Sequence, residues 1–591
     1  MRRAVSRASV ALLAGAASLV LASAAAAAAP HVTISPLPGT PDANPATQIS
    51  FLGVPASELR EVTVTGSRSG LHAGRIEAYS TGTGASFLPS QPFDPGERVS
   101  VVALAAGRRV RSSFEIGSPV TLTEPGPNHV RADPPDSLSF HSLPGLRPPT
   151  VTVSTPAADP ALGDVFVAPN LSLGQAGPMI LAPDGRLVYF KRLPDTLTAR
   201  NADEQTYLGR PVLTWWQGQI VQGHGQGVDE IYSSAYRHLA TVRAGNGLLA
   251  DLHDFVVTSQ GTAWITAFAP EQWNTAPYGG VADGVVDDAV IQEIDIRTGL
   301  VMFQWDAIGH VELADSYVRA PHLSYVPFDW FHINSIDPQA DGDILISSRN
   351  TWTVYELDGA TGRVLWRLGG KRSSFSLGPG VRFAWQHDAT LQPDGTITIF
   401  DNEDTPRERP HSRAIDVVLD FKTLEATLGW AFEHPGTPTL AASQGNVQAL
   451  PGGDIFVGWG QDGPFTEIAP SGRATLDMHF VDNDSYRAYR YPWTAQPYTR
   501  PAIALGPAAG GSTEVYASWN GATGVASWTV LAGGSASHLG PVGTFPDSGF
   551  ETAMQAPTSA PDIAVEAISA SGAVLATSRI ASDTSRQRRR S

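Results

Sequence analysis

Three histidines open successive copies of one sequence repeat, and this shared position constrains the fold more than any other feature of the chain. They are His253, His332 and His387, and a fourth copy opens at Gln444, so the copies begin 79, 55 and 57 residues apart. Each opening is followed by a turn and a hydrophobic strand, and usually by another turn and strand. A repeat of about 40–50 residues with about four strands is typical of a β-propeller. The pattern therefore predicts an all-β fold in which three imidazoles face one central axis.

The best-preserved copies contain the turns that such sheets need. Asp341-Gly342 follows His332, and Asp394-Gly395 follows His387. An Asp-Gly pair suits a hairpin because glycine reaches positive φ without a Cβ clash. The 58 glycines and 46 prolines among 591 residues also favour a turn-rich β protein over a helical one. With two weaker copies before His253, we expect a six-bladed β-propeller, although five or seven blades also fit the pattern.

Composition shifts divide the chain into segments. The basic residues Arg2 and Arg3, an apolar stretch and an alanine run before Pro30 indicate an export signal, with a retained membrane anchor as the alternative. We therefore expect an exported protein, extracellular or associated with the cell envelope, with no integral membrane span after signal cleavage. The expected segments are a signal peptide (1–29), an N-terminal β-sandwich-like domain (30–118), a Pro-rich linker (119–150), the propeller (151–495), a C-terminal β-sandwich-like domain (496–582) and a basic tail (583–591).

Composition also excludes several kinds of chemistry. The chain has no cysteine, which removes disulfides, thiolate catalysis and cysteine zinc sites. Its net charge of −17 argues against a nucleic-acid partner, but not against a small anionic substrate, because the local field governs a buried site. The segment Gly369-Gly370-Lys371-Arg372 lacks the spacing of a phosphate-binding loop, and no Gly-x-Ser-x-Gly elbow is present.

The repeat predicts a cationic site made of His253, His332, His387 and Arg349. Arg349 ends a strand of the repeat copy that His332 opens, and its side chain should reach the same central axis. Three imidazoles and one guanidinium suit a sulfate or phosphate group, and an imidazole can serve as base, acid or nucleophile. The structural alternatives are hydrogen-bonded core histidines and an ion pair between blades. We expect the histidines without a repeat position to be structural or surface residues: His224, His238, His310, His322, His411 and His434.

A metal ion is the other use that three histidines could have. We expect none, because Arg349 would repel a cation and no carboxylate occupies the matching repeat position. Asp254 and Asp388 directly follow histidines, and on a strand they should point to the opposite face. No cofactor is expected either.

Several sequence motifs follow one another in a defined order between about Leu252 and Trp493. They are FDWFHINSID, ILISSRNTW, TGRVLWRLGGKRSSF, FAWQHDA, SQGNVQALPGGDIFVGWG and SYRAYRYPW. Together they resemble the bacterial arylsulfotransferase (aryl sulfate sulfotransferase) family. Members of that family are exported six-bladed propellers that transfer a sulfuryl group between phenols without a nucleotide donor.

The resemblance implies roles for the four site residues. His387 would be the nucleophile that is transiently sulfurylated, and His332 and Arg349 would hold the sulfuryl oxygens. His253 would complete the anion cradle and exchange a proton with the phenol. Candidates for contact with the aryl ring are Trp385, Trp459 and Phe383.

The predicted function is therefore nucleotide-independent sulfuryl transfer from a phenolic sulfate donor to a phenol acceptor through a sulfohistidine. One alternative keeps the site but hydrolyses the sulfate ester. Another is a non-catalytic propeller that binds a partner or acts as a scaffold at the cell surface. A third is a different propeller enzyme, such as a metal-dependent lyase or a quinone-cofactor dehydrogenase. The oligomeric state is left open.

Overall fold

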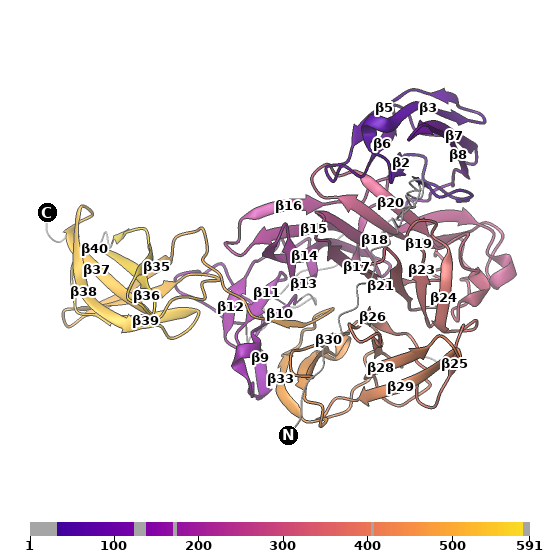
Figure 1. The fold of residues 1–591 in the computed structure, drawn as a ribbon. Coiled ribbons are helices and arrows are strands. Elements are labelled where there is room, and N and C mark those ends of the chain that lie inside the picture. The colour runs from indigo at the N-terminus through magenta and orange to yellow at the C-terminus, as the bar shows by residue number, and fades with distance from the viewer. Residues whose placement is uncertain (1–31, 123–136, 170–173, 404–406, 583–591) are drawn as a thin grey trace, which may run out of the picture. The chain divides into compact units, whose positions relative to one another are not determined.

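The computed structural model describes residues 32–122, 137–169, 174–403 and 407–582. These residues form an all-β protein whose helices are short 3-10 turns, so the predicted fold class is confirmed at this level (Figure 1). The predicted signal peptide, the basic tail and part of the Pro-rich linker lie outside the described residues. No helix among the described residues is long and apolar enough to cross a membrane. The 3-10 turns are η1 (Ala56–Glu58), η2 (Pro160–Leu162), η3 (Ala276–Tyr278), η4 (Leu313–Asp315) and η5 (Gly460–Asp462).

Two four-stranded sheets near the N-terminus share one hydrophobic core. In β7, valine and alanine side chains are buried while the residues between them are more exposed, the period of two expected for a strand with one face on a core. Phe51 and Phe87 from one sheet meet Phe114 from the other in this core. In spatial order the sheets are β1 (Thr33–Ser35), β2 (Ile49–Leu52), β6 (Gly84–Pro89), β5 (Gly74–Ala78) and β4 (Gly70–His72), β3 (Leu59–Gly66), β7 (Arg98–Ala105), β8 (Arg108–Glu115).

The middle of the chain begins with two antiparallel sheets. The larger has eight strands, and its halves β13–β16 and β17–β20 are joined through one pair, Gly227 and Ala250. The first sheet contains β12 (Leu187–Phe190), β11 (Met179–Leu181), β10 (Asp164–Val167) and β34 (Tyr489–Tyr491). The second contains β13 (Thr198–Tyr207), β14 (Arg210–Val221), β15 (His224–Ser233), β16 (His238–Val242), β17 (Ala250–Val257), β18 (Thr262–Trp273), β19 (Gly284–Asp295) and β20 (Val301–Asp306).

Three further sheets follow along the chain, and in each the strands from the repeat are antiparallel. The first is β21 (Ile333–Pro338), β22 (Ile344–Ser348), β23 (Thr353–Leu357), β24 (Val364–Gly369). The second is β26 (His387–Leu391), β27 (Ile397–Asp401), β28 (Arg413–Asp420), β29 (Glu425–Phe432), with β25 (Ser376–Leu377) added in parallel. The third is β30 (Asn446–Ala449), β31 (Ile455–Gly458), β32 (Pro464–Ile468), β33 (Ala474–Phe480), with β9 (Val151–Thr155) at its edge.

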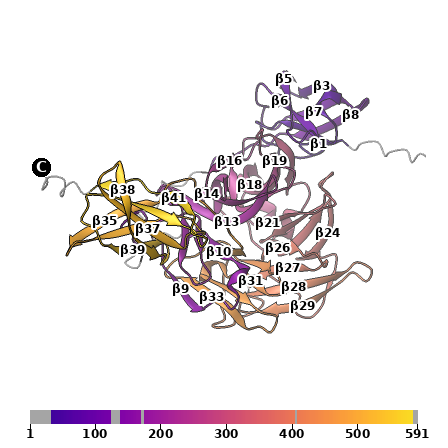
Figure 2. The same ribbon diagram turned by 60° about the vertical axis from the view of Figure 1, so that its left-hand side comes forward.

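The first strands of successive sheets contact one another in chain order. β10 contacts β13, β13 contacts β17, β17 contacts β21, β21 contacts β26, and β26 contacts β30. The end of the region returns to its beginning, because β34 pairs with β10 and β33 pairs with β9. Both views show β21 and β26 next to each other (Figures 1 and 2). The strands that carry or follow the three predicted histidines therefore lie side by side.

Buried aspartates in two of these first strands form hydrogen bonds with the next sheet. The Asp254 carboxylate accepts the backbone N–H of Ile336 at 2.7 Å, and the Asp388 carboxylate accepts that of Val447 at 2.8 Å. These two aspartates bind different partners from the neighbouring histidines, and both lie at irregularities of their strand ladders, where Asp388 has a φ of 54°. Arg487 joins both of them, with Nη1 at 2.9 Å from Asp254 Oδ1 and 3.6 Å from Asp388 Oδ1.

Two more sheets form the C-terminal part. Val515, Trp519, Trp528 and Val565 are buried together in the core that these sheets share. The buried tryptophans agree with the alternating pattern seen in the sequence. The sheets are β35 (Ala502–Ala509), β36 (Ser512–Ser518), β39 (Glu551–Ala556) and β38 (His538–Pro546), β37 (Ser527–Ser535), β40 (Asp562–Ile568), β41 (Val574–Thr577), with β42 (Ala581–Ser582) also paired to β40.

Arg487→Met should destabilise the fold strongly. Arg487 is buried and also donates to the backbone oxygen of Asn334 at 2.8 Å, so its loss leaves two buried carboxylates without their counter-charge. Breaking a buried ion pair in this way costs about 3–5 kcal/mol. Chemical denaturation measures the loss, and Arg98→Met, which breaks the exposed pair between Arg98 and Glu115, should cost less than about 1 kcal/mol. Equal losses in the two variants would contradict this role of Arg487.

Candidate active site

The structure brings the predicted histidines together in one buried cluster. His253 lies in β17, His332 precedes β21, and His387 begins β26. The ring centroids of His253 and His332 are 4.8 Å apart. The ring of Tyr486 lies 5.6 Å from that of His253 and 6.0 Å from that of His387. Tyr486 thus lies between the first and the third histidine.

The hydrogen bonds around His387 define which ring nitrogen is available. The Asn402 amide nitrogen donates to the backbone oxygens of Ala441 and Gln444, so its oxygen faces the ring. His387 Nδ1 lies 2.7 Å from that oxygen and must therefore carry the proton. His387 Nε2 accepts the backbone N–H of Gln444 at 3.1 Å. Nε2 is therefore the unprotonated ring nitrogen, and its lone pair accepts this N–H.

Each of the other two histidines is oriented by a carboxylate. His253 Nδ1 lies 2.6 Å from Asp251 Oδ2, and His332 Nδ1 lies 2.5 Å from Asp329 Oδ2. A carboxylate at Nδ1 fixes the tautomer and leaves Nε2 to exchange a proton or to bind an anion once protonated. Asp251 is itself held by the backbone N–H groups of Gly225 and His253.

Arg349 stands at the wall of a cavity beside these histidines. Its guanidinium carbon lies 4.5 Å from the ring centroid of Trp385, and its Nη1 donates to Asn350 Oδ1 at 3.1 Å. The cavity has a volume of about 380 Å³ and is also lined by Asp329 and by part of the segment 318–328. A planar, delocalised cation on an aromatic face can hold a sulfuryl oxygen next to an aryl ring.

Burial favours the neutral imidazoles of His332 and His387. Burial and then the charge of Arg349 lower the pKa of His387 well below the usual range. Burial lowers the pKa of His332 in the same way, assisted by His253 and Arg349. Burial alone would raise the pKa of Asp251, but the neighbouring His253 charge and hydrogen bond bring it below its ordinary value. A neutral imidazole retains the ring-nitrogen electron pair that a nucleophile or a base needs.

The structure adds three residues to the predicted cluster. His224, expected to be a structural or surface residue, is buried, and its ring centroid lies 5.2 Å from that of His332 and 6.0 Å from that of His253. Its signal was only a histidine between glycines at the start of β15. Asp251 and Asp329 lie two and three residues before their histidine partners and not at the repeat position for which the sequence predicted no carboxylate.

The three candidates for contact with an aryl ring lie in different surroundings. Trp385 lines the cavity beside Arg349. Trp459 is fully buried against Phe400 and His434, and Phe383 packs in the hydrophobic core beneath β27. Trp459 and Phe383 are therefore core residues of their sheets, because each fills the interior space that its strand faces.

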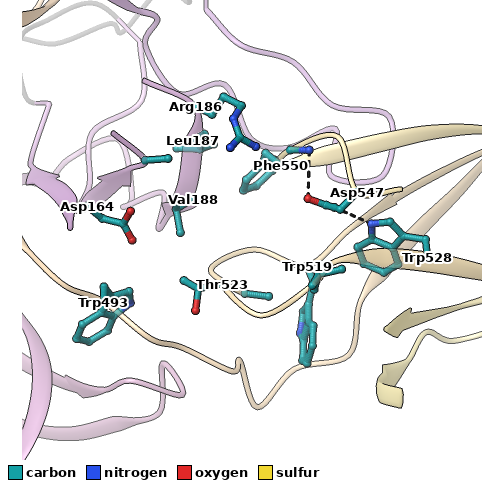
Figure 3. A pocket seen from close by; sticks show the side chains of 14 residues that line it. Asp164, Arg186, Leu187, Val188, Trp493, Trp519, Thr523, Trp528, Asp547 and Phe550 are labelled. Atoms are coloured by element: carbon teal, nitrogen blue, oxygen red, sulfur yellow. Dashed lines mark hydrogen bonds between the residues drawn. The ribbon is translucent and has the colours of Figure 1, made fainter. Parts of the chain in front are cut away.

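A second cavity, of about 360 Å³, lies elsewhere and contains none of the predicted site residues. Figure 3 shows its tryptophans, with Trp528 Nε1 donating to Asp547 Oδ1 at 2.8 Å. Asp164 and Arg186 supply its charges.

Fold and site together define an all-β protein with a buried histidine cluster beside an arginine. Residues 204–481 match the model of the family described as Arylsulfotransferase (ASST), and this region includes all four predicted site residues. This part of the chain is therefore similar to the arylsulfotransferase family, and the match supports a transferase. No curated protein matches the chain.

Similar solved structures are distant in sequence. A protein of unknown function from Bacteroides caccae is 12% identical, with 56% of this chain and 98% of that chain covered and a TM-score of 0.35. An inactive virginiamycin B lyase from Staphylococcus aureus is 9% identical, with 62% and 95% covered and a TM-score of 0.28. A streptogramin B lyase is 11% identical, with 72% and 98% covered and a TM-score of 0.26. Scores this low say nothing about the chemistry of the site.

Asp251→Asn should destabilise the protein by about 3 kcal/mol, because the ionised Asp251 accepts four hydrogen bonds in a fully buried position. An amide offers one acceptor oxygen and turns a donor toward the N–H groups. Thr266→Val is the matched control, since it removes one neutral donor to the same carboxylate and should cost about 1 kcal/mol. Urea denaturation compares the two, and an Asp251→Asn protein as stable as the wild type would show that the carboxylate is not ionised.

Proposed function

We propose that the protein transfers a sulfuryl group from an aryl sulfate ester to a phenol through a sulfohistidine at His387. One observation supports this most directly. His387 Nδ1 is protonated against Asn402, and Nε2 keeps its lone pair beside Arg349 and two further histidines. The family match over residues 204–481 supports the same reaction class.

In the first half-reaction, His387 Nε2 attacks sulfur and the bond from sulfur to the phenolic oxygen breaks. The phenolate leaves and takes up a proton. Sulfuryl transfer passes through a loose transition state, by analogy with phosphoryl transfer, so fixed positive charge around the three equatorial oxygens matters most. Arg349 supplies a permanent charge, and His332 supplies an imidazole that Asp329 orients.

In the second half-reaction, the acceptor phenol attacks the sulfur and His387 Nε2 departs with its electron pair. The phenol must lose its proton to become a good nucleophile. His253 is suited to take that proton, because Asp251 holds Nδ1–H and leaves Nε2 as the base. Two successive displacements at one nitrogen give ping-pong kinetics without a nucleotide.

We also propose the finer architecture predicted from the sequence. The six first strands β10, β13, β17, β21, β26 and β30 would each begin one blade of a six-bladed propeller over residues 151–495. Pairing of β34 with β10 would close the ring. Residues 30–118 and 496–582 would be separate sandwich domains, and export through the signal at 1–29 would place the protein outside the cytoplasm.

His387→Ala should lower phenol-dependent turnover of a chromogenic aryl sulfate by about a thousand-fold or more, because the nucleophile is lost. His434→Ala is the control, since His434 is a buried histidine paired with Asp477 at 3.2 Å in another part of the fold. Intact-mass analysis of the wild type after brief exposure to donor alone should show one added SO₃ group on His387. Turnover without this adduct would contradict the sulfohistidine. Release of inorganic sulfate in the presence of phenols would indicate hydrolysis.

The rate of the first half-reaction should stay nearly constant between about pH 8 and pH 6. A histidine of ordinary pKa would become protonated across this range and lose its lone pair. His387 has a pKa well below 6.5, so it remains neutral and active. Stopped-flow detection of the phenol burst at enzyme concentration, with donor only, isolates this step from proton removal by His253. A burst rate that falls with an apparent pKa near 6.5 would contradict the prediction.

A further inference from the structure

The cavity of about 360 Å³ shown in Figure 3 has a lining that the proposed transfer does not use. One wall comes from β10 and β12, and the other comes from residues 493–550. Two hydrogen bonds join these walls. Asn520 Nδ2 donates to the backbone oxygen of Phe190 at 2.8 Å, and the backbone N–H of Phe190 donates to Asn520 Oδ1 at 3.0 Å. The groups on the two walls are therefore held in place relative to one another.

Four aromatic side chains line this cavity: Trp493, Trp519, Trp528 and Phe550. The three indole N–H groups are already bound within the protein. At 2.8–3.0 Å they donate to the Tyr236 hydroxyl, the Thr499 backbone oxygen and the Asp547 carboxylate. The rings can therefore offer a ligand their π surfaces but no hydrogen-bond donor.

The Asp164 carboxylate is the acceptor that remains open. Figure 3 shows it turned toward the space that Val188 and Thr523 border, and no other described residue forms a hydrogen bond with it. Arg490, whose charge also acts on Asp164, is bound to Glu467 and to two backbone oxygens. A carboxylate in this state gains from a ligand that donates hydrogen bonds to it.

The charges of the lining favour a cation as the ligand. Asp164 and Asp547 contribute two carboxylates. Arg186 is the one guanidinium among the described lining residues, and its Nε donates to Asp184 at 2.7 Å, so a third carboxylate already offsets it. A cation would be attracted to these carboxylates and an anion repelled. The faces of tryptophan and phenylalanine rings also attract an ammonium group.

We propose that this cavity binds a small organic ammonium ion, whose charged nitrogen pairs with Asp164 and whose apolar body packs among Trp493, Trp519 and Phe550. The nitrogen supplies the N–H donors that Asp164 lacks and the positive charge that the lining attracts. The carbon body fills the space that the aromatic rings border. This binding function is additional to the proposed sulfuryl transfer, because the cavity contains none of the four predicted site residues.

The competing occupant is a neutral hydroxylated ligand such as a sugar. Its hydroxyl groups could also donate to Asp164, and its C–H faces could pack on the indole rings. Several hydroxyls need donors as well as acceptors, however, and the indole N–H groups are already used. Asp164→Asn separates the two occupants. It removes the ion pair with an ammonium group but keeps an acceptor oxygen for a hydroxyl.

The experiment is isothermal titration calorimetry of the full chain at pH 8, with benzylamine, its neutral counterpart benzyl alcohol, and methyl glucoside. Burial raises the pKa of Asp164 to about 6, so this carboxylate is ionised at pH 8 while benzylamine is protonated. Benzylamine should bind about tenfold or more tightly than benzyl alcohol, because hydrogen bonds between charged groups are stronger than neutral ones.

Three variants locate the binding. Asp164→Asn should weaken benzylamine binding about tenfold or more, because the charged partner is lost. Phe550→Leu keeps apolar bulk but removes one ring and should weaken it about threefold. Asp195→Asn makes the same charge change at an exposed carboxylate outside the cavity and should leave binding unchanged.

Benzyl alcohol or methyl glucoside that binds as tightly as benzylamine would overturn the proposal. So would benzylamine that fails to bind at millimolar concentration, or that binds wild type and Asp164→Asn equally. Asp164→Asn should unfold at the wild-type thermal midpoint, because the carboxylate makes no hydrogen bond to the described residues, and this checks that the variant folds. No phenol or sulfate ester enters these measurements. Their failure therefore leaves transfer at His387 untouched, and absence of the sulfohistidine leaves the ammonium site untouched.

Discussion

The opposite placement of a histidine and of the aspartate that follows it is the constraint on which the rest of this structure depends. His253 and Asp254 are neighbours in β17, and His387 and Asp388 are neighbours in β26. In each pair the histidine turns toward the shared cluster and the aspartate turns to the other face, where Arg487 and the backbone of the next sheet bind it. Each His-Asp pair thus supplies a histidine to the cluster and an aspartate whose hydrogen bonds hold the strand in place. A register slip by one residue would exchange the two roles.

The electrostatics of the site follow from this arrangement. Burial lowers the pKa values of His332 and His387, while Asp251 and Asp329 orient His253 and His332 through Nδ1. In the proposed reaction a sulfuryl group would meet a permanent cation, Arg349, and imidazoles that gain charge only when they accept a proton. This combination of one permanent cation and neutral imidazoles suits a reaction in which negative charge moves from the leaving oxygen to the nucleophile and back. Fully charged histidines would bind the substrate well but could not attack it.

Much of this could be predicted from the repeat, and what could not has a physical reason. The positions of His253, His332 and His387 at equivalent openings indicated an all-β fold and a common site, since equivalent strands meet. Asp251 and Asp329 were not indicated because they stand at different distances from their histidines, so no repeat position marks them. His224 belongs to β15, whose beginning is no repeat opening, and only the contact between neighbouring sheets brings it to the cluster. Trp459 could not be told from a substrate-binding tryptophan, because core and site indoles share the same local sequence pattern.

The fourth repeat copy does not open with a histidine, yet its backbone contacts the site. Gln444 stands where the other copies have histidine, and its backbone, at a φ of 70°, directs its N–H to His387 Nε2. A residue other than glycine adopts positive φ at a cost, which indicates that this N–H is held in place by its surroundings. While Nε2 is free, the N–H keeps the lone pair oriented. In the proposed reaction, Nε2 could no longer accept once it bonds to sulfur, and the released N–H would become available as one more donor to the sulfuryl oxygens. A histidine side chain is not needed there, because the backbone performs the orienting role.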